Sequence, residues 1–191
     1  YQGRALSPTS WDERPGANII KGREMAWIRL ERYYEGNENT ENEFSADFDT
    51  RFVPMMCQHC ETPPCVDVCP PGASFKRVDG IVLVDKHLCI GCRYCMMACP
   101  YKARSFVHEP VSGQNPDVPR GKGTVESCTM CVHRVDNGQQ PACAEACTNK
   151  AILFGDLNDA ESEISRKIRS VASVQVRADL GLNTGVRYQG L

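Results

Sequence analysis

The chain has 191 residues, of which 41% are hydrophobic and 24% are charged, a composition typical of globular proteins and unlike that of disordered or collagen-like chains. Its 22 Lys and Arg residues against 24 Asp and Glu residues give a net charge of -2, which excludes a basic surface for nucleic acid. The longest purely apolar runs, such as residues 81–84 and 151–154, are far below the roughly 20 residues that span a bilayer. We therefore expect no nucleic-acid partner, no direct membrane span, and any link to a membrane through a partner.

The N-terminal part of the chain is predicted to contain one strand followed by one loop. Within residues 22–36, Ile28 and Leu30 alternate with charged neighbours, a pattern typical of a strand. Residues 36–50 are polar and acidic with few apolar side chains, which predicts a solvated loop. We assign residues 1–52 to this N-terminal segment.

The 12 cysteines come next and fall into three groups of four, with none left over. The groups are Cys57, Cys60, Cys65 and Cys69; Cys89, Cys92, Cys95 and Cys99; and Cys128, Cys131, Cys143 and Cys147. The second group is followed by Pro100 and has the CxxCxxCxxxCP spacing of bacterial ferredoxins without any departure. The first group lengthens the middle gap by two residues, and the third separates CxxC from CxxxC by a long gap.

This spacing predicts iron–sulfur clusters held by crossed sets of ligands. Soft thiolates suit iron–sulfur chemistry, and a CxxCxxC loop brings three thiolates to three irons of one cubane. In two-cluster ferredoxins the fourth cysteine of each motif binds the other cluster. The same crossing predicts site 1 on Cys57, Cys60, Cys65 and Cys99, and site 2 on Cys69, Cys89, Cys92 and Cys95.

Zinc and disulfides explain the cysteines less well. Structural zinc fills four positions and has no use for a third cysteine and a CxxxCP tail repeated in register. Disulfides need an oxidising compartment and Cα spacings that tight CxxCxxC loops rarely offer for all twelve at once. His59 lies between two ligands, and we expect it to donate a hydrogen bond nearby and not to bind iron.

Each cluster loop is predicted to run into a short helix and then a β-like segment. After the first group, Asp79-Gly80 separates residues 74–78 from residues 81–84 and indicates a hairpin turn. Residues 102–107 and 151–154 are the corresponding β-like segments after the second and third groups. The expected fold class is α+β, a tandem ferredoxin-like iron–sulfur domain over residues 53–157 with short helices, small β-hairpins and a loop insertion at 108–127.

The last part of the chain, residues 158–191, is predicted to form a helix and a docking tail. Asn158 is a candidate N-cap with Glu161 three residues later, and Ile164 and Ile168 lie on one helical face. The tail beyond the helix is expected to dock on the body of the protein or on a neighbouring subunit.

No catalytic constellation is discernible, because the four histidines are scattered and no Ser/His/Asp set, paired carboxylates or phosphate-binding glycine loop occurs. Six basic side chains lie close to the cysteine motifs in sequence. We expect each of them either to tune the potential of a cluster, to face a partner or to form ordinary solvated surface. They are Lys76, Arg77, Lys86, Arg93, Lys102 and Arg104.

Three stretches carry a family resemblance: CQHCETPPCVDVCP, GIVLVDKHLCIGCRYCMMACPYKARSF and ESCTMCVHRVDNGQQPACAEACTNKAILFGDL. They resemble the iron–sulfur electron-transfer (B-type) component of complex iron–sulfur molybdoenzymes, the group of the dimethyl sulfoxide, tetrathionate and polysulfide reductases. The DsrO subunit, the menaquinone reductase iron–sulfur subunit and the iron–sulfur region of alternative complex III are similar too. The resemblance covers roughly residues 22–157.

The chain departs from this family in the number of cysteine groups. Members typically have four groups and four clusters, whereas no cysteine precedes Cys57 here. The resemblance implies that Cys128, Cys131 and Cys143 share a cluster with the missing group and that Cys147 completes another. Alternatively, these four close on one cubane, which we call site 3, and the chain holds three [4Fe-4S] clusters. A missing N-terminal group would add a fourth cluster, of the [4Fe-4S] or [3Fe-4S] type. Because Cys92 is present where some relatives lack a cysteine, site 2 is expected to hold [4Fe-4S].

The resemblance implies a non-catalytic electron-transfer subunit of a respiratory oxidoreductase complex. Its partners would be a molybdopterin-type catalytic subunit and an NrfD-like integral membrane subunit that reacts with quinone. The implied location is the periplasmic face of a membrane, with the cytoplasmic face as the alternative. A free-standing soluble polyferredoxin is the second hypothesis and a zinc-binding interaction module the third.

Overall fold

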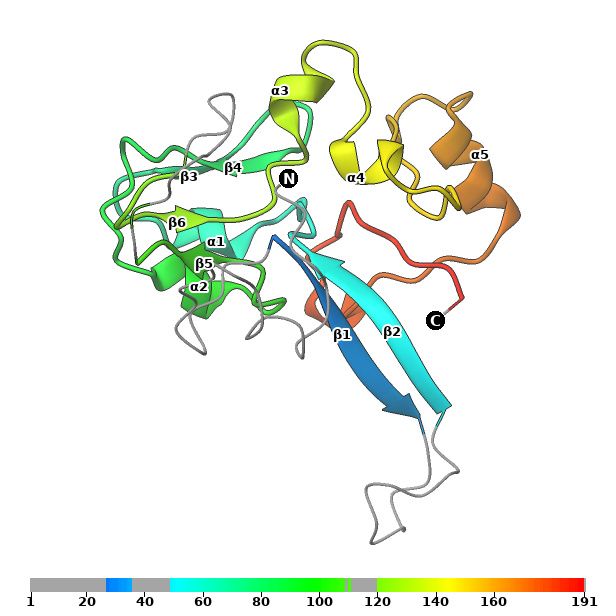
Figure 1. Cartoon of the computed structure of the whole chain (residues 1–191), viewed down its shortest axis with the longest axis horizontal. Helices are drawn as coiled ribbons and strands as arrows, with labels where there is room; N and C mark the ends of the chain where they lie inside the picture. The colour runs from blue at the N-terminus through cyan, green and yellow to red at the C-terminus, as the bar shows by residue number, and fades with distance from the viewer. Residues whose placement is uncertain (1–26, 36–48, 109, 111–119, 191) are drawn as a thin grey trace, which may run out of the picture.

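The computed structural model describes residues 27–35, 49–108, 110 and 120–190, and within them the elements are short (Figure 1). They are β1 Ile28–Glu35, β2 Asp49–Met56, α1 Pro64–Asp67, β3 Ser74–Lys76, β4 Val82–Val84, α2 Tyr94–Ala98, β5 Ser105–Phe106, β6 Val125–Glu126, α3 Val132–Val135, α4 Ala142–Glu145, α5 Glu163–Ser170 and the 3-10 helix η2 Ala178–Leu180. The described strands form three separate two-stranded sheets, β1-β2, β3-β4 and β5-β6. Short helices between small hairpins confirm the expected ferredoxin-like α+β class.

The predicted N-terminal strand is β1, which pairs antiparallel with β2 from Ile28 opposite Met56 to Glu35 opposite Asp49. Residues 49 and 50 therefore lie in a strand and not in the expected loop, because ladder hydrogen bonds to β1 hold even polar residues extended. The rest of that expected loop, residues 36–48, lies outside the described residues. In Figure 1 the hairpin extends away from the short helices, while the end of β2 leads straight into the first cysteine group.

The Asp79-Gly80 turn is confirmed. Strands β3 and β4 pair antiparallel around it, and Arg77 N donates to the Ile81 carbonyl at 2.9 Å. Gly80 has a φ of +89°, a left-handed conformation that glycine adopts without steric cost. Asp79 Oδ1 accepts a hydrogen bond from Ile81 N at 3.2 Å and so closes the turn from the other side.

The β-like segments expected after the second and third groups have different outcomes. Residues 105–106 form β5, which pairs antiparallel with β6. Strand β6 lies inside the insertion expected at 108–127, so the end of that insertion is regular; residues 109 and 111–119 lie outside the described part of the chain. Residues 151–154 form no strand, because no other described segment offers them a backbone ladder to pair with.

The C-terminal helix begins later than predicted. Its N-cap is Ser162, whose Oγ accepts a hydrogen bond from Ser165 N at 3.3 Å, and not Asn158. Asn158 instead lies in a turn in which its own backbone N donates to Asp156 Oδ1 at 2.8 Å. Ile164 and Ile168 lie on the less exposed side of α5, as the periodicity predicted.

The tail docks on the body of the protein, over the loop that carries the first cysteine group. Gly185 N donates to the Gln58 carbonyl at 2.9 Å, and Glu61 N donates to the Leu182 carbonyl at 3.1 Å. Tyr188 packs against the core cluster and donates from its hydroxyl to the Pro54 carbonyl at 2.9 Å. Among the described residues, no helix has the length and apolar character needed to cross a membrane.

Candidate metal centres

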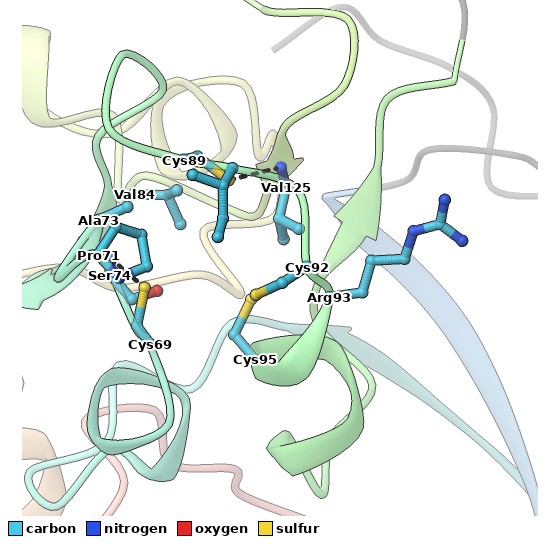
Figure 2. Close-up of a pocket in the computed structure, with 11 residues that line it drawn as sticks. Cys69, Pro71, Ala73, Ser74, Val84, Cys89, Cys92, Arg93, Cys95 and Val125 are labelled. Atoms are coloured by element: carbon cyan, nitrogen blue, oxygen red, sulfur yellow. Dashed lines mark hydrogen bonds between the residues drawn. The ribbon is translucent and has the colours of Figure 1, made fainter.

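The four cysteines expected at site 2 line one pocket (Figure 2). Cys69 follows α1, Cys89 and Cys92 lie on the loop before α2, and Cys95 lies in α2 itself. Two backbone amides point at sulfur, because Ser74 N lies 3.2 Å from Cys69 Sγ and Val125 N lies 3.4 Å from Cys89 Sγ. Such N–H donors stabilise thiolates and set the potential of a bound iron–sulfur cluster.

Gly91 lets the loop between Cys89 and Cys92 pack closely against the β5-β6 hairpin. A Cβ at this position would meet the Gly123 carbonyl oxygen at 2.3 Å, and its φ is +71°. At the far end of the loop, Arg93 also has a left-handed φ of 67° and stacks its guanidinium 4.1 Å from the Phe106 ring centroid. In Figure 2 the Arg93 side chain points away from the space between the four sulfurs. The left-handed backbone conformations at Gly91 and Arg93 therefore accompany a loop whose cysteines face the pocket and whose arginine side chain points away from it.

The four cysteines expected at site 1 also lie within mutual electrostatic range. Burial raises the pKa of the Cys60 thiol to about 12, and neighbouring Cys57, Cys65 and Cys99 contribute to this rise. Burial likewise raises the pKa of the Cys65 thiol to about 11, with Arg104 opposing the rise. Cys99 comes from the second cysteine group, so the crossed set predicted from the spacing is gathered in space. A bound cation or metal cluster favours the thiolate form of such buried thiols.

The third group is gathered less completely. Burial raises the pKa of the Cys143 thiol, and the nearby sulfurs of Cys131 and Cys147 add to this effect. Cys128 is buried in the hydrophobic core cluster that also contains Cys57 and Cys60. Cys147 differs from the others, since hydrogen bonding from backbone N–H groups, that of Ala151 foremost, lowers its pKa. The Ala151 N to Cys147 Sγ distance is 3.2 Å.

Several buried polar atoms around these cysteines lack a partner among the described residues, as expected where a group rich in acceptors belongs. Among them are His59 Nε2, Tyr101 Oη, Arg104 Nε, Arg104 Nη2 and His133 Nδ1, while one acceptor beside Cys57, Gln58 Oε1, also lacks a partner. His59 accepts at Nδ1 from Val82 N at 3.0 Å, so the donation expected from the sequence can come only from the buried Nε2. Sulfides and thiolates of a cluster are acceptors for such donors, so the residues present fit iron–sulfur clusters.

The thiols are spread around a space and do not meet at a point. In the described part of the chain, no three His, Cys, Asp or Glu side chains converge tightly enough to hold a single metal ion. A zinc site needs its thiolates within a bond length of one atom, whereas a cubane places them at four separate irons.

The basic side chains near the motifs divide into surface and interior. Lys102 is exposed, and Arg77 forms an ion pair with the exposed carboxylate of Asp136. Arg104 is only 4% exposed and lies among the cysteines. Glu126, which sequence reasoning missed, is fully buried; its ion pairs with Arg120 and Lys86 link β6 to the segment before Cys89. No spacing rule marks a lone buried glutamate, so nothing in the sequence pattern pointed to it.

Short helices and hairpins that carry cysteine loops around two adjacent thiol-lined sites define a ferredoxin-like iron–sulfur protein. Residues 48–157 match the family described as 4Fe-4S dicluster domain, so the chain belongs to that family. The resemblance inferred from the cysteine motifs is thereby confirmed.

Three curated relatives show the same kinship. The chain is 50% identical over 154 residues to the Hdr-like menaquinol oxidoreductase iron-sulfur subunit 1 of Archaeoglobus fulgidus, a match covering 73% of this chain and 57% of the relative. It is 44% identical over 142 residues to the iron-sulfur component of a putative dimethyl sulfoxide reductase of Halobacterium salinarum (72% and 54%). It is 44% identical over 137 residues to the protein NrfC of Escherichia coli (71% and 56%). In each case the match spans a little over half of the relative's length.

Proposed function

We propose that this chain is an electron-transfer component of a respiratory oxidoreductase, relaying single electrons through [4Fe-4S] clusters. A bound [4Fe-4S] cluster accepts one electron and passes it on without making or breaking a bond to substrate. The chain's own residues hold the clusters, exclude water from site 1 through the buried Cys57, Cys60 and Cys65, and supply N–H donors to sulfur.

The observation that carries this proposal is that Cys69 and Cys99 each lie near cysteines of the other group. Cys69 lines the same pocket as the second group, and Cys99 acts electrostatically on Cys60 of the first group. Two loops that trade ligands must lie side by side, so clusters bound there are neighbours. Short cluster-to-cluster distances are what a relay requires. We assign Cys57, Cys60, Cys65 and Cys99 to the first cluster, and Cys69, Cys89, Cys92 and Cys95 to the second.

We propose a third [4Fe-4S] cluster on Cys128, Cys131, Cys143 and Cys147. The mutual effect of Cys131, Cys143 and Cys147 supports it, and the lowered pKa of Cys147 makes that thiol a ready ligand. Sharing of these cysteines with a further N-terminal group, as in four-cluster relatives, is the alternative arrangement.

The proposed partners are a catalytic subunit of the molybdopterin type and an NrfD-like membrane subunit that reacts with quinone. The relatives' names support this proposal, since they include a putative dimethyl sulfoxide reductase and a menaquinol oxidoreductase. A peripheral position on the periplasmic face of a membrane follows from the same resemblance. A free soluble polyferredoxin is the competing function, and it predicts a monomer that binds partners reversibly.

The first experiment counts iron and acid-labile sulfide per chain in the anaerobically purified native assembly, with the N-terminus mapped by mass spectrometry. About 12 irons on these cysteines alone supports three cubanes, and about 16 with further cysteines upstream supports the shared arrangement. A colourless protein with one or two zinc ions overturns the proposal. Purification as a stable complex rather than a monomer separates the subunit function from the free polyferredoxin.

The ligand assignment is tested by a matched pair of variants, Cys99→Ser and Cys69→Ser. Crossed ligation predicts that Cys99→Ser perturbs the cluster of Cys57, Cys60 and Cys65, and that Cys69→Ser perturbs the cluster of Cys89, Cys92 and Cys95. Electron paramagnetic resonance of the reduced complex distinguishes the two signals. If each variant instead removes the signal of the cluster nearest to it in sequence, the crossed assignment is wrong.

A further inference from the structure

Arg104 lies between site 1 and site 2, in the segment that links Cys99 to strand β5. The residue is 4% exposed and its neighbours Ala103 and Val107 are also buried. Its Nη1 donates to the Ser74 hydroxyl, which is likewise buried. Ser74 is the same residue whose backbone N–H points at Cys69 Sγ. The guanidinium is therefore held in place by a residue that already belongs to the wall of site 2.

The guanidinium faces cysteines of both sites. Its strongest charge interactions are with Cys65 and Cys57 of site 1 and with Cys95 of site 2. Burial raises the pKa of both the Cys65 and the Cys95 thiol, and the positive charge of Arg104 opposes the rise in each case. The one cation thus acts on thiols that belong to different proposed clusters.

Among the described residues Arg104 has no carboxylate partner; its guanidinium lies within hydrogen-bonding range of the Cys65 and Cys95 thiols, whereas Nε and Nη2 are left without a partner. The buried carboxylate of Glu126 is paired with Arg120 and Lys86 instead. A buried cation with unused donors is costly unless an anion with several acceptors lies beside it. Two clusters, each net negative with its four thiolates and richer by one negative charge when reduced, supply such an anion on both sides.

We propose that Arg104 is a shared positioning residue for the clusters of site 1 and site 2: its fixed charge and its Nε and Nη2 donors raise the reduction potentials of both clusters together. This inference rests on the proposed ligand sets. A positive charge stabilises the reduced, more negative state of a cluster more than the oxidised state, which sets the direction of the shift. Because one cation acts on both clusters, it shifts the two potentials in the same direction.

The test is an electron paramagnetic resonance-monitored redox titration of the native complex carrying Arg104→Gln, Arg104→Lys or Lys102→Gln. Lys102 is exposed and lies two residues away, so Lys102→Gln removes the same charge from the surface as a control. We expect Arg104→Gln to lower both midpoint potentials, each by at least a tenfold change in the reduction equilibrium, about 59 mV for one electron. Lys102→Gln is expected to leave both within error.

Arg104→Lys keeps the charge but not the planar fork, so one ammonium cannot donate toward both sites at once. We expect it to lower the potential of one cluster and to spare the other, and it decides the question if Arg104→Gln fails to retain its clusters. Unchanged potentials in an iron-replete Arg104→Lys or Arg104→Gln variant, or shifts equal to those of Lys102→Gln, overturn the inference. If the potentials are unchanged but both cluster signals are present, only the inference about Arg104 fails and the proposed electron transfer stands. If the unmutated complex shows no cluster signals, the proposed function itself is refuted.

Discussion

Replacing Glu126 with glutamine is expected to weaken the whole assembly of loops around site 2. The Glu126 side chain is fully buried; its Oε2 accepts from Arg120 Nε at 2.9 Å and lies 3.4 Å from Lys86 Nζ. Both cations are themselves largely buried, at 11% and 18% side-chain exposure. Glu126→Gln keeps the shape but removes the charge that both cations face. Breaking a buried ion pair from one side costs about 3–5 kcal/mol.

Because cluster proteins unfold irreversibly, the effect is best measured as a rate, namely the loss of visible cluster absorbance in guanidinium under anaerobic conditions. If the ion pairs are absent from the unfolding transition state, about 3–5 kcal/mol corresponds to bleaching faster by about two to four orders of magnitude. Asp179→Asn, which breaks an exposed pair with Arg177, is the control and should bleach at the unmutated rate. A Glu126→Gln rate within twofold of the control would refute the reasoning that this network secures the site.

Three further outcomes are expected. Gly91→Ala places a Cβ against the Gly123 carbonyl and should cost about four irons per chain from site 2, whereas Gly80→Ala, which has open space, should retain full iron content. Burial lowers the pKa of Lys86 below its unfolded value of 10.5, with Glu126 opposing the shift. Between the lowered pKa of Lys86 in the folded protein and 10.5, the unfolded chain therefore binds more protons than the folded chain, so stability rises with pH. Bleaching of the unmutated protein should slow, relative to bleaching of Lys86→Met, as pH rises toward 10.5. Equal pH profiles of the two proteins would contradict this. Ser162→Ala removes the cap of α5 and should speed hydrogen exchange of its amides by an amount corresponding to about 1 kcal/mol, with Ser170→Ala as the control.

The parts of the fold that were predictable are those in which covalent spacing dictates geometry. The CxxCxxCxxxCP motif predicts a loop, then a short helix, then a fourth cysteine just after the helix. The structure has this order at residues 89–99. Asp79-Gly80 was equally informative, because a turn with a left-handed glycine depends on two residues only. In these places local sequence suffices.

The parts that were not predictable depend on partners far away in the chain. The apolar run at 151–154 has strand character but no described strand to pair with, and β6 forms inside an apparently irregular insertion because β5 lies beside it. Both Asn158 and Ser162 are good caps, and the close approach of Gly155 to Ile164 favours the later start of α5. Arg104 was one basic residue among six, and only its burial between two sites singles it out.

The docking of the tail has a consequence for how the protein is made. The loop of Cys57 and Cys60 is secured by residues that the ribosome adds more than a hundred positions later, such as Tyr188, whose hydroxyl accepts from Gln58 Nε2 at 3.1 Å. Since a chain emerges from its N-terminal side, this loop is synthesised well before the residues that cover it. We therefore expect site 1 to acquire its final closed form only after residues 182–188 have been synthesised and have docked on this loop.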